Sequence, residues 1–539
     1  MDPAADPGAA PARGIAGAAR RAVAGVRQGP AGPVLSGLGW NTLAQVTTVA
    51  INLALTPFLL LHIGTTRYGL YALLSSFTGL VSNLDAGIGP TATQYFAVAA
   101  GAGDRRATSS LLATLSLASL AAVGLLTGTV ALLAPDLTGV LHGTAGIQHT
   151  GAVLLRVFMP LLFAASFRGL LQRLIRGQHR WAFLTGTGAA GTVTYAVLAF
   201  VLVGEGHGLG GLVVANVAQE VVLDVTLAFG ARRAITPRGL RPLPWAETRE
   251  LLHYASRVQI AEVASSFNIE IDALVVAAIF PLRYVAFYSI GSNFATQLIG
   301  VPVNAIPPIA VSLSRAFGRA GARAALEVFP ALQRGWVRAV AAVPLVGAAA
   351  AYFGIWRWLG PGERLAGVVA VVLLAGRSTS LWSAVMDSLG KSINRPGIES
   401  AYLGLGMAVN VVVTVPLALS IGMLGVPVGT AVAETASRLY LLRLSRRAID
   451  PDLRSYLADL PLAAIAAGAA VTLALEVPTF LVAPPGPAGL IVCGIPAALG
   501  IAAYVLVLRA PGQRSRGVGT PGARTRGAPG DIAVDEPLP

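Results

Sequence analysis

The sequence has few charged residues, one cysteine and one lysine, and these shortages exclude whole classes of protein. Of its 539 residues 12% are charged and 55% are hydrophobic, whereas soluble domains carry about 25% charged residues. A water-facing surface of ordinary size cannot be built from such a chain. Cys493 lies in an apolar stretch, which excludes an intramolecular disulfide and a cysteine metal cluster. Lys391 is the single lysine, so arginine carries nearly all of the positive charge.

What the sequence does have is one apolar run after another between Gly37 and Leu508. A membrane helix needs about 20 mostly apolar residues, and on that criterion we count about 14 spans. Arginines fall almost wholly into every second connection, with about 29 basic residues on one side and about 4 on the other. This alternation predicts an all-α integral protein of the inner (plasma) membrane, with both basic termini in the cytoplasm. The net charge of +14 then suits lipid headgroups at the span ends and not nucleic acid.

The apolar runs fall into two halves that resemble each other. An Arg-Tyr pair stands at the start of a span in each half, at Arg67–Tyr68 and Arg283–Tyr284, 216 positions apart (67 to 283). Both copies leave the cytoplasm in the same direction, which predicts two parallel six-helix lobes around a central cavity, a transporter architecture. Chance similarity between two apolar hairpins is the alternative. The predicted regions are a basic disordered N-terminus (1–36), an N-lobe (37–230), a cytoplasmic linker (231–251), a C-lobe (252–445), two accessory helices (446–508) and a disordered cytoplasmic tail (509–539).

Acidic side chains within the spans are candidates for coupling transport to a cation. Charge at the bilayer centre is costly and usually faces a cavity or a partner. Asp85 in the second span and Glu262, Glu270 and Asp272 in the seventh could therefore bind H+ or Na+ in a hydrated cavity. The alternatives are structural: Asp85 could accept hydrogen bonds at a helix break, Glu262 could pair with Arg257, and Asp272 could pack against a polar neighbouring span.

Arginines within the spans are candidates for binding an anionic group, because a guanidinium donates two parallel hydrogen bonds to a diphosphate. Arg377 is the strongest of them, since further hydroxyl-bearing residues follow it. Arg168 could instead be the first cytoplasmic anchor of a basic cluster that ends at Arg180. The other candidates for the cavity are Arg257, Arg156 and the polar Asn268. We find no motif of a soluble enzyme and no Walker A sequence, so we predict a protein that is not an enzyme, with no catalytic residue, metal site or cofactor.

Two stretches carry motifs of a known family. The first contains Ile63-Gly64, Tyr68-Gly-Leu-Tyr71, Leu84-Asp85-Ala-Gly-Ile-Gly89 and the turn Gly103-Asp104-Arg105-Arg106; the second contains Asn268, Asp272 and the turn from Arg283 to Tyr288. With these motifs the chain resembles the polysaccharide biosynthesis flippases, which are the Wzx-type exporters of lipopolysaccharide and O-antigen units. They share a superfamily with multidrug and toxic-compound extruders and the lipid II flippase. Members commonly follow the seventh-span aspartate with a basic residue, where Ala273 stands here.

The resemblance implies a transporter that moves a polyprenyl-diphosphate-linked oligosaccharide from the cytoplasmic to the outer leaflet by alternating access, for synthesis of cell-surface polysaccharide. The arginines within the spans would hold the diphosphate and the sugar while the polyprenyl tail stays in the membrane lipid. Many members end two spans earlier, so the last two helices here would be accessory. A polysaccharide polymerase and glycosyltransferases would be the partner proteins.

Two other functions remain open from the sequence. A cation-coupled exporter of drugs or other small amphipathic molecules would suit an acidic, apolar cavity. A membrane glycosyltransferase or polysaccharide ligase is less expected, because such enzymes usually need a sizeable outer loop and the outer connections here are short.

Overall fold

The computed structural model describes residues 32–83, 104–139, 144–178, 180–249, 270–393, 396–449 and 461–509, with a few positions between 92 and 99 and at 251 and 253. Within these ranges the chain is helical and contains no strand. Ten helical stretches are long and apolar enough to cross a membrane. The prediction of an all-α, multi-pass membrane protein is therefore confirmed.

Two of the ten stretches contain more than one α-helix. Residues 397–447 include α15 (Pro396–Ile421) and α16 (Gly425–Ile449). These helices pack along each other after the chain turns at Gly422, whose φ of 74° favours glycine. Residues 321–359 join the end of α11 (Ile306–Val340) to α12 (Val343–Leu359). The number of about 14 spans stays a prediction.

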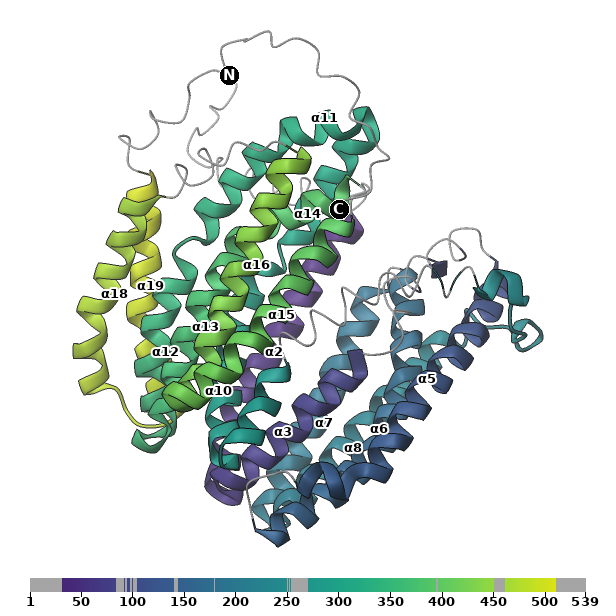
Figure 1. Cartoon of the computed structure of the whole chain (residues 1–539), viewed down its shortest axis with the longest axis horizontal. Helices are drawn as coiled ribbons and strands as arrows, with labels where there is room; N and C mark the ends of the chain where they lie inside the picture. The colour runs from purple at the N-terminus through teal and green to yellow at the C-terminus, as the bar shows by residue number, and fades with distance from the viewer. Residues whose placement is uncertain are drawn as a thin grey trace, which may run out of the picture.

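The helices of the N-terminal half form one bundle: α3 and α5 to α8 lie at the lower right of Figure 1, and α2 runs through the centre of that view. α2 packs along α7, α7 along α8, α8 against α6, and α6 along α5, while α3 contacts α6. These elements are α2 (Gly32–Ile63), α3 (Thr65–Asn83), α5 (Arg105–Gly139), α6 (Ala145–Gly177), α7 (Trp181–Gly204) and α8 (Gly208–Ala231).

The second bundle is built around α13, which packs against α10, α12 and α16. A short helix, α14, continues from α13 and lies against α11. α18 and α19 pack on each other and on α12, at the outer flank of this bundle (Figure 1). The further elements are α10 (Leu282–Val303), α13 (Arg364–Trp382), α14 (Ala384–Ser392), α18 (Leu462–Val482) and α19 (Pro487–Arg509), with helical residues 270–279 before α10.

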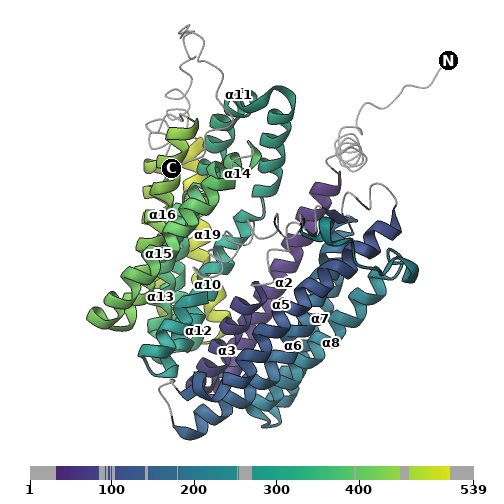
Figure 2. The same ribbon diagram turned by 45° about the vertical axis from the view of Figure 1, so that its right-hand side comes forward.

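The two bundles meet where the two copies of the sequence repeat begin. α3 starts at Thr65 and α10 at Leu282, and these helices pack against each other. From this contact the bundles diverge toward their other ends (Figures 1 and 2). Helices at matching positions of the repeat thus form the contact between the bundles. The exact lobe boundaries stay a prediction.

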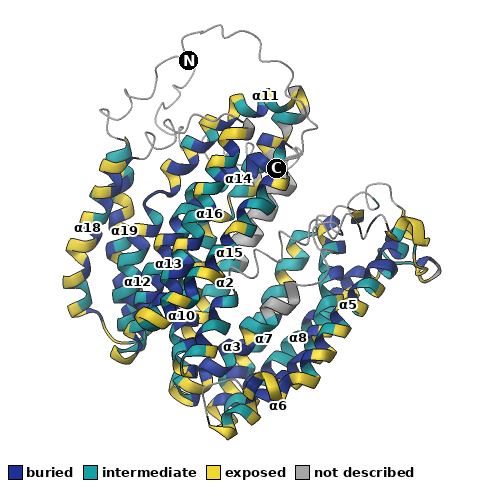
Figure 3. Cartoon of the chain, in the orientation of Figure 1, coloured by how far each residue is buried: buried dark blue, intermediate teal, exposed yellow. Residues whose placement is uncertain are grey.

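Burial follows the pattern expected of helices in lipid. Buried positions line the contacts between helices, and exposed positions run along the outward faces (Figure 3). Many of these exposed side chains are large and apolar, such as Leu132 at 80%, Val225 at 63% and Val482 at 80% exposure. Such surfaces would associate in water, but they match the hydrocarbon of a bilayer.

Candidate functional site

A fully buried carboxylate lies inside the second bundle. Asp272 is 0% exposed, and its Oδ2 accepts hydrogen bonds from Tyr288 on α10 and Thr430 on α16, each at 2.5 Å. Its Oδ1 has no hydrogen-bond partner among the described residues. Asn410 on α15 is a further neighbour; Thr414 donates to its side-chain oxygen at 2.7 Å, while its amide nitrogen is unpaired. The unpaired oxygen of this buried carboxylate can accept a hydrogen bond from the nearby Asn410 amide, or it can take a proton or a cation.

A second polar layer contains Arg377 of α13. Its Nη1 donates to the main-chain oxygen of Ser292 at 3.2 Å and to Oγ1 of Thr296 at 2.5 Å, and its Nη2 donates to Oγ of Ser292 at 3.3 Å. Its Nε lies 3.8 Å from Oε1 of Glu434, and the two side chains are only 11% and 22% exposed. The predicted anion-binding residue is therefore inside the bundle and already has partners.

The two layers lie one helical turn apart. Tyr288 and Ser292 are four residues apart on α10, and Thr430 and Glu434 are four apart on α16. One turn of an α-helix advances about 5.4 Å, so the same two helices position both layers. We call Asp272, Tyr288, Thr430, Arg377, Ser292 and Glu434 the polar ladder. It brings two carboxylates and one guanidinium together in the interior.

Further polar contacts continue from the ladder toward the end of the bundle that the arginine pattern predicts to be cytoplasmic. Arg438, one turn beyond Glu434, donates from Nε to Oγ of Ser380 at 2.9 Å, and its guanidinium lies 4.8 Å from the Tyr402 ring centre. The Tyr402 hydroxyl donates to Oδ1 of Asp387 at 2.6 Å.

The single lysine lies beside the last of these groups. Its Nζ is 3.1 Å from Asp387 and 2.8 Å from Glu399. Burial acts to lower the pKa of Lys391, but the two carboxylates outweigh it and raise the pKa above its ordinary value. The ammonium is thus held in its charged form.

The other predicted cavity residues that the structure describes lie elsewhere. Arg168 on α6 forms ion pairs with Glu220 and with Asp224, the latter at 3.4 Å. Arg156, also on α6, is exposed, and its Nε is 3.4 Å from the main-chain oxygen of Ala131. Both belong to the first bundle, so the structure does not bring them together with Arg377.

Among the predicted coupling residues, the structure brings Asp272 into the polar ladder. Glu270 interacts instead with the Ser76 hydroxyl of α3, across the contact between the bundles. The remaining predicted site residues lie outside the described residues: Asp85, Arg257, Glu262 and Asn268.

Sequence reasoning did not find the hydroxyl partners of Asp272. A hydroxyl within a span is a weak signal, because it can bond to its own helix. Thr430 does this too, with a second contact of 3.1 Å to the Val426 carbonyl. The spacing of four residues between Thr430, Glu434 and Arg438, which puts all three on one face of the helix, was the one signal available.

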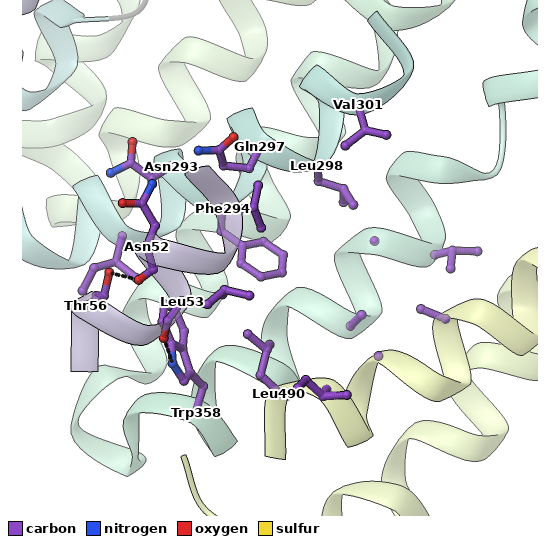
Figure 4. A pocket seen from close by; sticks show the side chains of 18 of the residues that line it. Asn52, Leu53, Thr56, Asn293, Phe294, Gln297, Leu298, Val301, Trp358 and Leu490 are labelled. Atoms are coloured by element: carbon purple, nitrogen blue, oxygen red, sulfur yellow. Dashed lines mark hydrogen bonds between the residues drawn. The ribbon is translucent and has the colours of Figure 1, made fainter. Parts of the chain in front are cut away.

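An apolar pocket of about 430 Å³ lies between α2, α10, α12 and α19 (Figure 4). The walls from α12 and α19 are mostly aliphatic, with Leu490 and Gly494 among them. Polar side chains in the lining come from α2 and α10 (Asn52, Thr56, Asn293 and Gln297), with Tyr68 of α3 and Trp358 of α12. The side-chain amides of Gln45 on α2 and Gln297 on α10 are hydrogen-bonded.

The pocket and Arg377 share one helix. Asn293 and Gln297, which line the pocket, each follow by one residue the Ser292 and Thr296 that contact Arg377. Successive residues of an α-helix are rotated by about 100°. One face of α10 therefore lines the apolar pocket, and the adjacent face contacts the partly buried guanidinium of Arg377 on α13.

Comparison with solved structures identifies the fold as that of polytopic membrane transporters. The lipid II flippase MurJ matches with a TM-score of 0.66 at 12% identity, over 88% of this chain and 98% of that chain. An inward-facing multidrug resistance transporter of the MATE family, in the MOP superfamily, matches with a TM-score of 0.57 at 14% identity, over 76% and 94%. A variant of the Vibrio cholerae MATE transporter VcmN gives 0.55 at 14%, over 79% and 98%. At these identities the likeness shows the fold.

The sequence itself shows the family. Residues 34–312 match the model of the polysaccharide biosynthesis protein family. The match covers more than half of the 539 residues, and the chain belongs to this family. No curated protein matches the chain.

Proposed function

We propose that this protein moves a polyprenyl-diphosphate-linked oligosaccharide from the cytoplasmic to the outer leaflet of the inner (plasma) membrane. Its membership of the polysaccharide biosynthesis family and its fold, similar to that of the lipid II flippase MurJ, support this function. The observation that carries the proposal is the position of α10: its contacts with the partly buried guanidinium of Arg377 and its face toward the apolar pocket are about a quarter of a helical turn apart. A lipid with an anionic headgroup needs both features close together.

The headgroup would meet Arg377 and two hydroxyl groups. Ser292 and Thr296 now accept hydrogen bonds from the guanidinium. A diphosphate could take their place as acceptor, and the freed hydroxyls could then donate to its oxygens. A guanidinium is suited to this exchange because its planar donors match a phosphate in pairs. Glu434 would hold Arg377 in place meanwhile.

The first units of the tail would occupy the pocket of Figure 4, while the rest of it stays in the membrane lipid. Isoprenoid units are branched hydrocarbon, and the α12 and α19 walls supply aliphatic contacts of the same kind. Because bilayer hydrocarbon is as apolar as these walls, the pocket would hold the tail by close packing of its branched units and not by removing it from water. The amides of Asn293 and Gln297 line the same pocket and could bond to polar atoms between tail and sugar.

The shape suits alternating access. The bundles are in contact where α3 and α10 begin and diverge toward the other end. The arginine-rich connections predict that this other end faces the cytoplasm. A substrate would then enter from the cytoplasmic side. Glycosyltransferases that complete the saccharide, and a polymerase that uses it outside, are the partners that such a step requires.

Asp272 would link transport to an ion. Its orphan Oδ1 and the hydroxyls of Tyr288 and Thr430 form an oxygen-rich site that can take H+ or Na+. Hard cations such as Na+ prefer oxygen ligands. An ion bound here would change the charge one turn from Arg377, which provides a route from ion binding to the headgroup.

A second function has one observation in its favour. Transporters of the MATE family share the fold, and an apolar pocket with a few amides also suits small amphipathic molecules. Export of such a molecule would need the pocket, but it would not need the guanidinium of Arg377 to bind a diphosphate.

Transport in proteoliposomes tests the proposal and separates the two functions. We expect the purified protein to move a polyprenyl-diphosphate saccharide between leaflets, and Arg377→Ala to abolish this movement. The matched control is Arg323→Ala, because Arg323 is an arginine whose side chain is 89% exposed. Movement of small amphipathic cations alone, insensitive to Arg377→Ala, would establish the second function instead.

A further inference from the structure

α18 carries a buried carboxyl group that forms no hydrogen bond to the described part of the chain. Glu476 is 0% exposed, and neither of its oxygens has a partner there. It is the single acidic residue in α12, α18 and α19 together. An ionised carboxylate without a partner is very costly in an apolar interior, so such a group takes up a proton instead. The polar ladder has no part in this site.

Glu476 lies in a tightly packed seam between α18 and α19. Gly468, Thr472 and Glu476 are spaced by four residues and form one buried stripe of α18. Opposite them, a Cβ added to Gly468 would stand 2.8 Å from the Gly500 carbonyl oxygen, and one added to Gly500 would collide with the Thr472 hydroxyl. Backbones so close favour a neutral carboxyl, because ionisation would bring a charge into space that cannot take its hydration shell.

Arg357, at the end of α12, is a charged residue that contacts the end of the α18–α19 hairpin. Its Nε donates to the main-chain oxygen of Ala483, and its own main-chain oxygen accepts from Gly486 at 3.1 Å. Its guanidinium also lies 5.5 Å from the Phe480 ring, one turn from Glu476. On the α19 side the titratable neighbour is the Cys493 thiol, which interacts electrostatically with both Glu476 and Arg357. Arg357 thus ties the end of the α18–α19 hairpin to α12.

We propose that Glu476 is a proton-binding site that controls how firmly this hairpin is held. With the proton bound, the neutral carboxyl fits the seam and Arg357 holds Ala483. With the proton lost, the carboxylate attracts Arg357 away from Ala483 and needs solvation, so α18 and α19 loosen. Since α19 forms one wall of the apolar pocket through Leu490, Gly494 and their neighbours, loosening would widen that pocket. The consequence for lipid transport rests on the proposed function, whereas the proton site does not.

The buried native cysteine reports this loosening directly. The intact protein in lipid nanodiscs is treated with N-ethylmaleimide at about pH 6 and about pH 9, as wild type and as Glu476→Gln, and alkylation of Cys493 is followed. At each pH the ratio of the two rates cancels the ordinary increase of thiolate with pH. The charge of an ionised Glu476 disfavours the neighbouring thiolate, so a faster reaction of the wild type cannot come from that charge and must come from access. We expect a ratio near one at the lower pH and a wild-type rate larger by about tenfold at the higher pH. A ratio of one at both values would overturn the proposal.

Two further measurements keep the test independent of folding and of transport. The infrared difference between wild type and Glu476→Gln should show the C=O stretch of a protonated acid at neutral pH; carboxylate bands in its place would overturn the assignment. Arg357→Gln removes the tie to Ala483 and should make Cys493 reactive at both pH values. Thr472→Val is the matched control in the same seam, and it should leave the pH dependence of wild type unchanged. None of these readouts depends on the transported lipid.

Discussion

Gly69 on α3 lies directly against the main-chain carbonyl group of Leu282 on α10. A Cβ at position 69 would stand 2.9 Å from the carbonyl carbon of Leu282 and would collide with its oxygen. Backbone of one bundle therefore touches backbone of the other, at the point where both repeat copies begin. In the proposed cycle this contact closes the outer end, and it must separate when the protein opens outward.

Substituting Gly69 by alanine should weaken this contact. The added methyl group must push α3 and α10 apart, and overpacking of this kind costs about 1–3 kcal/mol. We expect the population of outward-open molecules to rise, measured as a longer distance between spin labels on α3 and α10. Gly128→Ala is the control, because a Cβ at Gly128 meets nothing within 4 Å. An unchanged distance in Gly69→Ala would show that this contact does not set the conformation.

Arg377→Ala should abolish transport of the lipid-linked saccharide without removing the protein from the membrane. The change deletes the guanidinium proposed for the diphosphate and leaves Glu434 without its 3.8 Å partner. Arg377→Lys keeps the charge but lacks the planar pair of donors, so we expect intermediate transport. Transport rate and protein level are measured together. Normal transport in Arg377→Ala would exclude this residue from the site.

Asp272→Asn should remove the dependence of transport on a proton or sodium gradient. The amide is similar in size but cannot be ionised, so it cannot exchange the proposed ion. The rate is measured in proteoliposomes with and without each gradient. Asp387→Asn is the matched control outside the ladder. If both variants respond to the gradients as wild type does, Asp272 has a packing role only.

Lys391 should stabilise its end of the bundle over most of the pH range. Its pKa is raised in the folded protein, so its contribution is fully present below the ordinary lysine pKa of about 10.4 and is lost as the pH rises through the higher folded value. The side chain is 49% exposed, and such ion pairs contribute about 1 kcal/mol or less. Thermal unfolding of Lys391→Gln at neutral pH should show a small decrease in stability. The difference from wild type should vanish at strongly alkaline pH, and a constant difference would contradict this assignment.

Gly494→Phe should obstruct the pocket. Gly494 lines it from α19, and an aromatic ring there would occupy space proposed for the tail. We expect the apparent affinity for substrates with long polyprenyl chains to fall more than that for short-chain analogues. Leu499→Phe places the same ring on the 48% exposed face of α19, and it should have no such effect. Equal loss for long and short chains would place the tail outside this pocket.

The helical fold could be predicted because membrane spans are recognisable in a sequence as continuous apolar runs that alternate with basic connections. The family could be predicted from short motifs such as those around Tyr68 and Asp272. The repeat could also be seen in sequence, since Arg67 and Arg283 stand in equivalent positions. What could not be predicted is which helices touch. The contact of α3 with α10 and the partners of Arg377 depend on packing between segments far apart in the chain.

The candidate site was predictable only in part, for the same reason. Charged residues such as Asp272 and Arg377 attract notice in an apolar span, but a neutral hydroxyl like that of Tyr288 does not. Glu434 lies on another helix from Arg377, and nothing in the sequence shows that they pair. The apolar pocket has no signature at all, because its lining consists of the residue types that fill every span.

The most direct test of the central claim is to measure polyprenyl-diphosphate saccharides separately in the two leaflets of cells depleted of this protein. The account predicts that the lipid-linked saccharide accumulates in the cytoplasmic leaflet alone, and mass spectrometry of it would identify the sugar. Accumulation in the outer leaflet, or no accumulation, would contradict a role in flipping.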